Sequence, residues 1–171
     1  MLSSEINATL NAQITWEFYS SYLYRQMASC LNSLGLGVLE ARFLQQADEE
    51  QLHATRLIGY VQKAGGRLQL GAIDAPPNHF ESPLAILEKT LSHEREVTRR
   101  IHALMAQAEQ EKDYSTRSYL QWYIDEQVEE EASFAELTQL TRMAGENLLL
   151  LEERIEKLMA AKAKTAAPPP P

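Results

Sequence analysis

Apolar residues recur every three or four positions along four long stretches of the chain, which is the period of an amphipathic α-helix. The pattern predicts helices over residues 4–34, 38–64, 83–111 and 114–143, and a short fifth helix over residues 147–161. Capping residues stand at the helix starts and glycines at the ends, namely Ser3 or Ser4, Ser82 and Asp113, and Gly35, Gly65 and Gly145. We therefore predict an all-α fold.

The lengths of the breaks between helices set the expected topology. Short breaks join the first helix to the second and the third to the fourth, so each pair should be antiparallel. The connection over residues 65–82 contains Pro76 and Pro77, and about 17 extended residues reach about 55 Å. That is longer than the roughly 40 Å of a 27-residue helix. We predict a four-helix bundle with one long crossover and a short fifth C-terminal helix.

We expect two segments in the chain. Residues 1–161 should form the single bundle domain, because this length can bury a substantial core. Residues 162–171 end in four prolines and should form an extended, flexible tail.

The core-facing stripe of each long helix is apolar at both ends and polar at its centre. The central residues are Glu17 on the first helix, Glu50 and His53 on the second, Glu94 on the third and Glu130 on the fourth. Several uncompensated carboxylates in a core would cost many kcal/mol, so they must be protonated or face a cation. A buried salt-bridge network is an alternative, but no lysine or arginine falls on these stripes near the centre.

The charge count favours a pair of metal ions, since two divalent ions would neutralise the four negative charges of these glutamates. Glu50 and His53 are spaced i, i+3 and share one helix face. One ion would bind Glu17, Glu50 and His53. The other would bind Glu50, Glu94 and Glu130, with Glu50 bridging. Oxygen ligands with a single imidazole suit iron or manganese, or zinc as an occupant, and two irons can each give an electron to dioxygen.

Gln127 lies one turn before Glu130 on the fourth helix. A symmetric pair of sites would have a second Glu-x-x-His motif at these two positions, whereas this chain has Gln-x-x-Glu. The second ion would then lack an imidazole and be held loosely, which suggests a site of transit over a permanent cofactor. Gln127 could equally form a hydrogen bond to the cluster from beside it.

Further acidic residues lie just off the stripes, and a tyrosine lies on the first stripe beyond Glu17. Tyr24 follows Ser21 on the first stripe and could donate an electron, form a hydrogen bond to a ligand, or simply pack in the core. A third, more exposed metal site or an ordinary solvated acidic face would account for Glu49, Glu126 and Glu129.

Net charge and cysteine content indicate which partners and which cellular compartment to expect. The formal net charge is -8 and the isoelectric point about 5.0, which argues against nucleic acid or an anionic membrane as partner. No secretory signal or span of about 20 apolar residues is visible. Cys30 is the only cysteine, which fits a reducing compartment. We expect a soluble cytoplasmic protein.

These motifs together resemble the bacterial non-haem ferritins over about residues 1–160. The resemblance rests on Glu17, Glu94 and the runs over residues 48–53, 120–123 and 126–131. It implies that the ferroxidase ligands are Glu17, Glu50, His53, Glu94 and Glu130, with Gln127 close by and Tyr24 next to the centre. It also implies a third iron site of Glu49, Glu126 and Glu129, sharing Glu130.

The resemblance implies a function and an assembly as well. Such ferritins form hollow homo-oligomeric cages of twenty-four subunits, oxidise Fe(II) with dioxygen or peroxide, and store a ferric mineral inside. Their fifth helix lines the four-fold axes. Bacterioferritins, a sister family, carry a haem-ligating methionine directly after the bridging glutamate, where this chain has Gln51, so we expect no haem. The tetraproline ending departs from the family pattern.

Two other functions compete with iron storage. A soluble di-iron oxidase or peroxidase of the same fold would need a pocket that reaches the metals. A non-catalytic helical interaction module would leave the buried acids unexplained.

Overall fold

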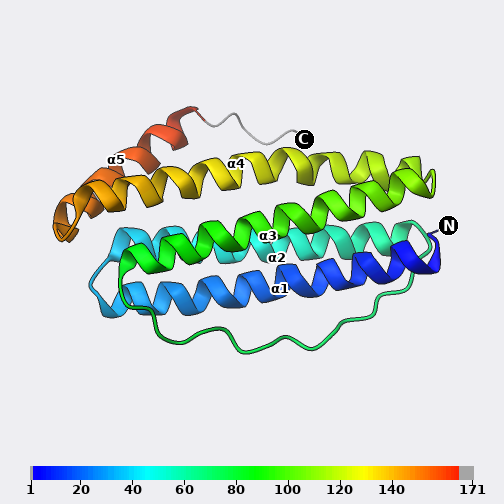
Figure 1. Cartoon of the computed structure of the whole chain (residues 1–171), viewed down its shortest axis with the longest axis horizontal. Helices are drawn as coiled ribbons and strands as arrows, with labels where there is room; N and C mark the ends of the chain where they lie inside the picture. Colours follow the sequence, from blue (N-terminus) through cyan, green and yellow to red (C-terminus); the bar gives the residue numbers. More distant parts are fainter. Residues whose placement is uncertain (1, 166–171) are drawn as a thin grey trace.

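The computed structural model describes the chain over residues 2–165, with side chains for residues 2–161. Five helices follow in order, α1 (Ser4–Ser33), α2 (Gly37–Lys63), α3 (Pro83–Gln110), α4 (Tyr114–Ala144) and α5 (Leu148–Thr165) (Figure 1). The first four form the bundle, with α1 antiparallel to α2, and α3 antiparallel to α4. The long crossover makes α2 and α3 parallel, so the predicted four-helix topology is confirmed.

Local side-chain chemistry starts most of these helices. The predicted caps accept hydrogen bonds from the first turn, with Ser3 bonded to the Ile6 amide, Ser82 to the Ala85 amide and Asp113 to the Thr116 amide. Gly35 and Gly65 follow the ends of α1 and α2 with φ of +75° and +77°, a conformation that a side chain would strain.

Helix α2 lacks a cap of its own and receives one from α5. The Glu152 carboxylate accepts hydrogen bonds from the backbone amides of Val38 at 2.7 Å and Leu39 at 3.0 Å. Leu151 and Ile155 of α5 are fully buried against the same end of the bundle. A charged cap and two apolar side chains therefore fix the start of α5 at the turn between α1 and α2.

Helix α5 extends beyond its predicted end. It runs to Thr165, so the first four residues of the predicted tail continue the helix. The tetraproline segment, residues 168–171, lies outside the described residues.

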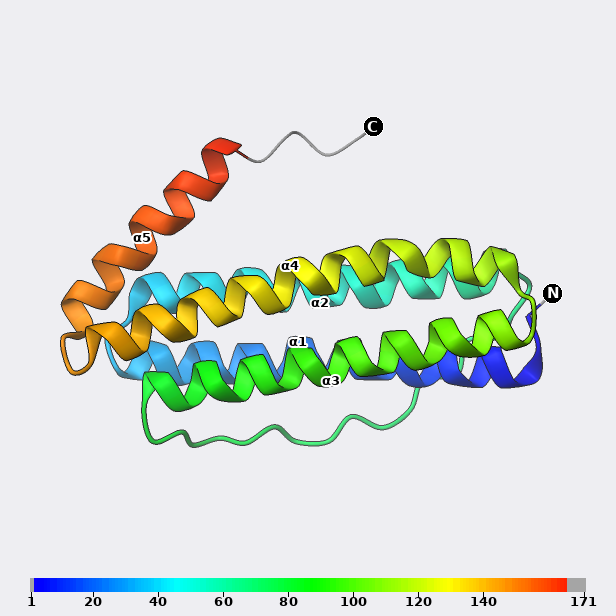
Figure 2. The same ribbon diagram turned by 45° about the horizontal axis from the view of Figure 1, so that its top comes forward.

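The crossover, residues 64–82, runs along one side of the bundle and returns the chain to the end where α2 began (Figures 1 and 2). Three side chains spaced four residues apart on α1 bind its backbone. Asn7 bonds to both backbone groups of Arg67, Asn11 to the Arg67 carbonyl and the Gln69 amide, and Thr15 to the Gly71 amide. One polar row on α1 thus satisfies a segment that has no secondary structure of its own.

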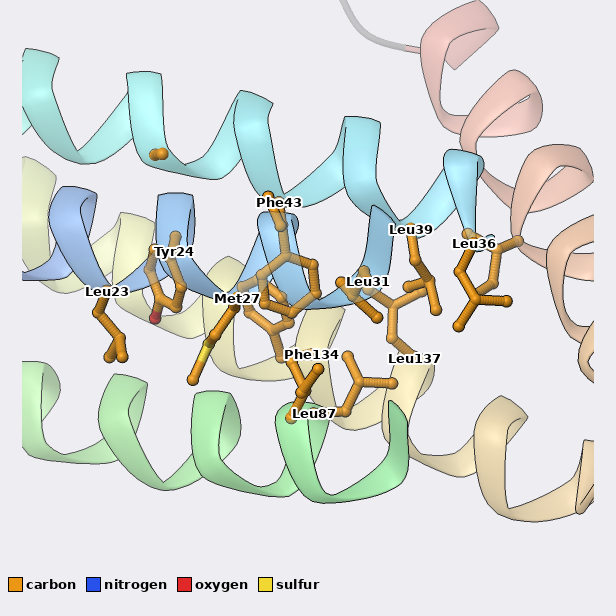
Figure 3. Packing of buried hydrophobic residues seen from close by; sticks show 14 of the residues in the cluster. Leu23, Tyr24, Met27, Leu31, Leu36, Leu39, Phe43, Leu87, Phe134 and Leu137 are labelled. Carbon is orange, nitrogen blue, oxygen red and sulfur yellow. The ribbon is translucent and has the colours of Figure 1, made fainter. Parts of the chain in front are cut away.

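Two apolar clusters fill the bundle on either side of its middle. One cluster, shown in Figure 3, includes Leu23, Met27, Leu31, Leu39, Phe43, Leu87, Phe134 and Leu137. The other includes Ile6, Leu10, Ile14, Leu57, Val61, Val97, Ile101 and Leu120. Among the described residues, no helix is long and apolar enough to cross a membrane.

Between the two clusters the buried side chains are polar. We call this region the polar belt, and define it as Glu17, Gln46, Glu50, His53, Glu94, Gln127 and Glu130. Its members come from all four helices of the bundle, so the topology brings them to one level. The apolar clusters above and below keep the belt out of bulk water.

Removing the Asn11 side chain tests the attachment of the crossover. Asn11 is 4 % exposed, and an alanine there leaves the Gln69 amide and the Arg67 carbonyl without this partner. We expect Asn11→Ala to lower the free energy of unfolding by about 1–3 kcal/mol in chemical denaturation. Asn32→Ala, which removes one exposed bond to Glu40, should change it by less than about 0.5 kcal/mol. Equal effects of the two substitutions would contradict this account.

Candidate metal centre

The bundle buries all five residues that the sequence predicts as principal ligands. They come from four helices, and their exposed fractions are 1 % for Glu17, 1 % for Glu50, 5 % for His53, 0 % for Glu94 and 6 % for Glu130. The helical period places each of them on the inner face, and the short turns hold the helices in register.

Glu17, Glu50 and His53 form the tightest group. Each offers one ligand atom, and these atoms lie within 4.8 Å of one another. His53 Nδ1 is 3.5 Å from Glu50 Oε2. The Tyr123 hydroxyl donates to the His53 backbone carbonyl at 2.9 Å, and the Trp122 ring meets the imidazole edge-on at 5.4 Å between centroids. Two carboxylates and one imidazole converge here as a metal ion requires.

Glu94 is held by Tyr24. The fully buried Tyr24 hydroxyl donates to Glu94 Oε1, and its ring packs against Phe43 and Phe134. Burial, followed by the charge of Glu94, raises the pKa of Tyr24 well above its ordinary value, so the hydroxyl keeps its proton and acts as a donor. Tyr24 therefore lies at the candidate metal site, in contact with the predicted ligand Glu94.

Two glutamines bond to the carboxylates. Gln13 Nε2 donates to Glu17 Oε1 at 2.8 Å. Gln46 Nε2 donates to Glu50 Oε1 at 3.0 Å and to Glu130 Oε1 at 2.9 Å, which links α2 to α4. Our sequence reasoning assigned no role to either glutamine. Their spacing is a usable signal, because each stands four residues before a buried glutamate and so lies one helical turn away.

The protein satisfies only one oxygen of each buried glutamate. Among the described residues, five buried side-chain polar atoms have no hydrogen-bond partner, and one of them is the indole nitrogen of Trp16. The other four are the Oε2 atoms of Glu17, Glu50, Glu94 and Glu130. Unpartnered buried oxygens are costly, and four of them in one belt fit a site that binds cations. The residues present therefore suit bound metal ions.

One cation does approach the belt, although it comes from outside the stripes. Arg42 lies beside the α2 stripe, and its guanidinium reaches to 3.8 Å from Glu130 Oε2 and 3.3 Å from Glu49 Oε2. The residue was missed because a long side chain can reach a site from a neighbouring row of the helix. A single positive charge does not balance four carboxylates, so a salt-bridge network alone does not account for the belt.

His93 provides no further positive charge. Burial, with smaller effects from Lys89 and Arg100, lowers its pKa to about 4. Its Nε2 lies 2.7 Å from the Ser20 hydroxyl. The imidazole is therefore neutral near pH 7.

Without metal, the belt holds protons. Burial raises the pKa of Glu17 to about 8, and the charge of Glu50 adds to the effect. Burial also raises the pKa of Glu50 to about 8, with a further contribution from Glu130. For Glu94 the pKa is raised well above its ordinary value by burial and then by Glu50, and for Glu130 it is raised by burial. A metal ion would displace these protons.

Gln127 is buried in the belt and bonds to α3. It is 4 % exposed, and its Oε1 accepts a hydrogen bond from Thr98 Oγ1 at 3.1 Å. Its carbonyl oxygen is thus directed to a neighbouring hydroxyl group.

The acidic residues predicted for a third site gather beside the belt without closing into a compact cluster. Burial raises the pKa of Glu126, with additions from Glu129 and Glu49 and an opposing effect of His53. Glu49 and Glu126 are half-buried, and Glu129 is exposed. In the described part of the chain, only Glu17, Glu50 and His53 place three ligand atoms within 4.8 Å.

One hollow in the described part of the chain could accept an organic substrate, but it does not reach the belt. A hollow of about 720 Å³ lies near the end of α2 and the start of α4, lined by Arg56, Tyr60, Lys63 and Tyr119 among others. None of the belt glutamates lines it.

The raised pKa values predict how the stability of the metal-free protein depends on pH. Between about pH 4.5 and 8, folded Glu17 keeps a proton that the unfolded chain releases, so rising pH favours unfolding. The loss approaches about 1.4 kcal/mol per pH unit for one such group. Glu17→Gln should therefore melt higher than the unsubstituted protein at about pH 7.5 and nearly equal to it at about pH 4.

Exposed Glu156 provides the control for this comparison, since Glu156→Gln makes the same substitution outside the belt. If Glu17→Gln melts lower than the unsubstituted protein at about pH 7.5, the conclusion that folded Glu17 keeps its proton and thereby destabilises the metal-free protein is wrong.

Comparison with known proteins agrees with this geometry. The model of the Ferritin-like domain family matches residues 7–144. A bacterial non-heme ferritin of Staphylococcus aureus (strain MRSA252) is 38 % identical over 156 residues, which cover 90 % of this chain and 94 % of that protein. A bacterial non-heme ferritin of Campylobacter jejuni is 35 % identical over 167 residues, covering 96 % and 100 %.

Solved structures show the same similarity. An open pore ferritin from the hyperthermophilic archaeon Archaeoglobus fulgidus superposes with a TM-score of 0.88 at 43 % identity, covering 90 % of this chain and 96 % of that one. A humanized archaeal ferritin gives 0.89 at 42 % identity, covering 92 % and 97 %. Buried carboxylates from four helices, the family match over most of the bundle and these structural relatives lead to one conclusion: the chain belongs to the ferritin-like family.

Proposed function

We propose that this protein stores iron, oxidising Fe(II) with dioxygen or peroxide in the polar belt and keeping the ferric product inside a homo-oligomeric cage. The observation that carries the proposal is the set of four buried glutamates. In each of them one oxygen accepts a hydrogen bond from Gln13, Gln46 or Tyr24, and the other oxygen has no hydrogen-bond partner. Its relatives are named ferritins, which supports the same function.

Two iron sites share Glu50 in this proposal. The first consists of Glu17, Glu50 and His53, whose ligand atoms already converge. The second consists of Glu50, Glu94 and Glu130. The bonds from Gln46 to Glu50 and Glu130 keep one oxygen of each in place, so the other oxygen can bind an ion without reorganising the helices.

The pair of sites matches the electron count of the reaction. Each Fe(II) gives one electron, and the two electrons together reduce dioxygen to hydrogen peroxide with uptake of two protons. The belt would hold the two ions at the distance this requires and exclude water between its apolar clusters. Tyr24 would orient Glu94 through the hydrogen bond from its hydroxyl.

Iron would pass through the belt without remaining there. The second site lacks an imidazole, because Gln127 takes that place and bonds to Thr98. Glu49, Glu126 and Glu129, sharing Glu130, would form a third and more exposed site on the way to the cage interior. Gln51 offers no thioether after the bridging Glu50, so the purified protein should show no haem absorption.

Assembly follows from the surface that one subunit leaves uncovered. Leu149 and Leu150 of α5 are 83 % and 38 % exposed, and contact with other subunits would bury them. We propose a cage of twenty-four subunits, as the ferritin family suggests. A cytoplasmic location is proposed as well, which the single free Cys30 supports.

Aerobic titration of metal-free protein with Fe(II) tests the proposal. We expect fast growth of ferric absorbance, with tens of irons or more per chain remaining soluble. Uptake that saturates near two or three irons per chain, with further iron precipitating, would contradict storage and favour a di-iron oxidase or peroxidase.

Glu50→Gln tests the placement of the pair of sites. Loss of a residue that merely supports a ligand typically costs about 10–100-fold in activity, and loss of the bridging ligand should cost more. The initial rate of Fe(II) oxidation measures this, with Glu156→Gln as control. An unchanged rate in Glu50→Gln would place oxidation elsewhere.

A further inference from the structure

Arg42 borders the belt, and the proposed function gives it no role. Its side chain is only 12 % exposed, and it extends along α2 from a position two turns before Glu50. The guanidinium lies 5.2 Å from the centroid of the Phe134 ring, which closes it in on the apolar side. A buried guanidinium remains charged, so it must serve the carboxylates around it.

The contacts of Arg42 are specific. Nη1 donates to Glu49 Oε2 at 3.3 Å, and Nη2 donates to Gln46 Oε1 at 2.6 Å. Nη2 also lies 3.8 Å from Glu130 Oε2, an oxygen that has no hydrogen-bond partner. One cation of this chain therefore stands between Glu49 and Glu130, the two carboxylates that border the belt on this side.

Those are also two of the ligands of the proposed third iron site. An ion placed there would bind Glu49, share Glu130 with the pair of sites, and lie a few ångströms from the guanidinium. A divalent ion and a guanidinium at that separation repel each other, and the repulsion is strong where water is largely excluded.

We propose that Arg42 is a built-in counter-cation that competes with a third metal ion for Glu49 and Glu130. The inference rests on the proposed function, because it refines the affinity of the third site. With Arg42 in place, the pair of sites fills first, and a third ion binds more weakly than either of the pair because it must displace the guanidinium. Arg42 thus acts as a positioning residue that determines how many ions the belt holds.

The contact with Gln46 gives Arg42 a second effect on the same site. Because the Gln46 carbonyl oxygen accepts from Arg42, its amide nitrogen faces Glu50 and Glu130 and donates to both. The guanidinium therefore fixes which way the glutamine amide points. This keeps Glu130 Oε1 bonded to Gln46.

Zinc titration of the assembled metal-free protein by calorimetry tests the proposal, since Zn(II) binds carboxylate and imidazole without redox chemistry. We expect two tight ions per subunit in the unsubstituted protein and three in Arg42→Met, with the third bound at least tenfold more tightly than before. Methionine keeps an unbranched apolar stem and removes the charge next to Phe134.

Two further variants make the expected gain specific. Arg25→Met removes an equal charge from an exposed ion pair with Asp48 and should leave the count at two. Adding Glu49→Gln to Arg42→Met should abolish the third ion. In the unsubstituted background, Glu49→Gln should leave the count at two, and this measurement does not depend on the folding of Arg42→Met.

The outcomes separate this inference from the proposed function. Two tight ions in both the unsubstituted protein and Arg42→Met would overturn the role of Arg42 and leave the pair of sites intact. Three tight ions in the unsubstituted protein, reduced to two by Glu49→Gln, would overturn it as well. Zinc binding that is unaffected by Glu50→Gln would instead overturn the pair of sites on which the inference rests.

Discussion

Four carboxylates held away from water are the constraint on which the rest of this structure depends. Each costs several kcal/mol to bury as an anion, and the chain compensates only part of that cost through Gln13, Gln46, Tyr24 and Arg42. In the metal-free protein these carboxyl groups keep their protons, because burial raises their pKa values. Metal binding and folding are therefore coupled, because cations that replace these protons relieve a strain that the bundle itself creates.

The architecture holds the belt at its level in spite of that cost. Two apolar clusters pack the bundle above and below it, so stability comes from the ends of the helices and the middle is left for chemistry. The crossover matters for the same reason, because it allows α2 and α3 to run parallel and brings Glu50 and Glu94 to the same height. The row of Asn7, Asn11 and Thr15 holds that crossover in place.

Much of this was predictable from the sequence, because helical periodicity decides which side chains face inward. The period put Glu17, Glu50, His53, Glu94 and Glu130 in the core, and the length of residues 64–82 decided the connectivity. Contacts across elements were not predictable. Glu152 caps a helix more than a hundred residues earlier in the chain, and Arg42 reaches the belt from outside its stripe. Such contacts depend on side-chain reach and on the angle between helices, which periodicity does not specify.

Anomalous diffraction from crystals soaked in Zn(II) or anaerobic Fe(II) tests the central claim most directly, since it locates metal without relying on activity. The account predicts two strong peaks inside each subunit at the level of the belt. One should be bound by Glu17, Glu50 and His53, and its neighbour by Glu50, Glu94 and Glu130. Peaks confined to exposed carboxylates, with none inside the bundle, would show that the buried glutamates do not bind metal and would contradict the account.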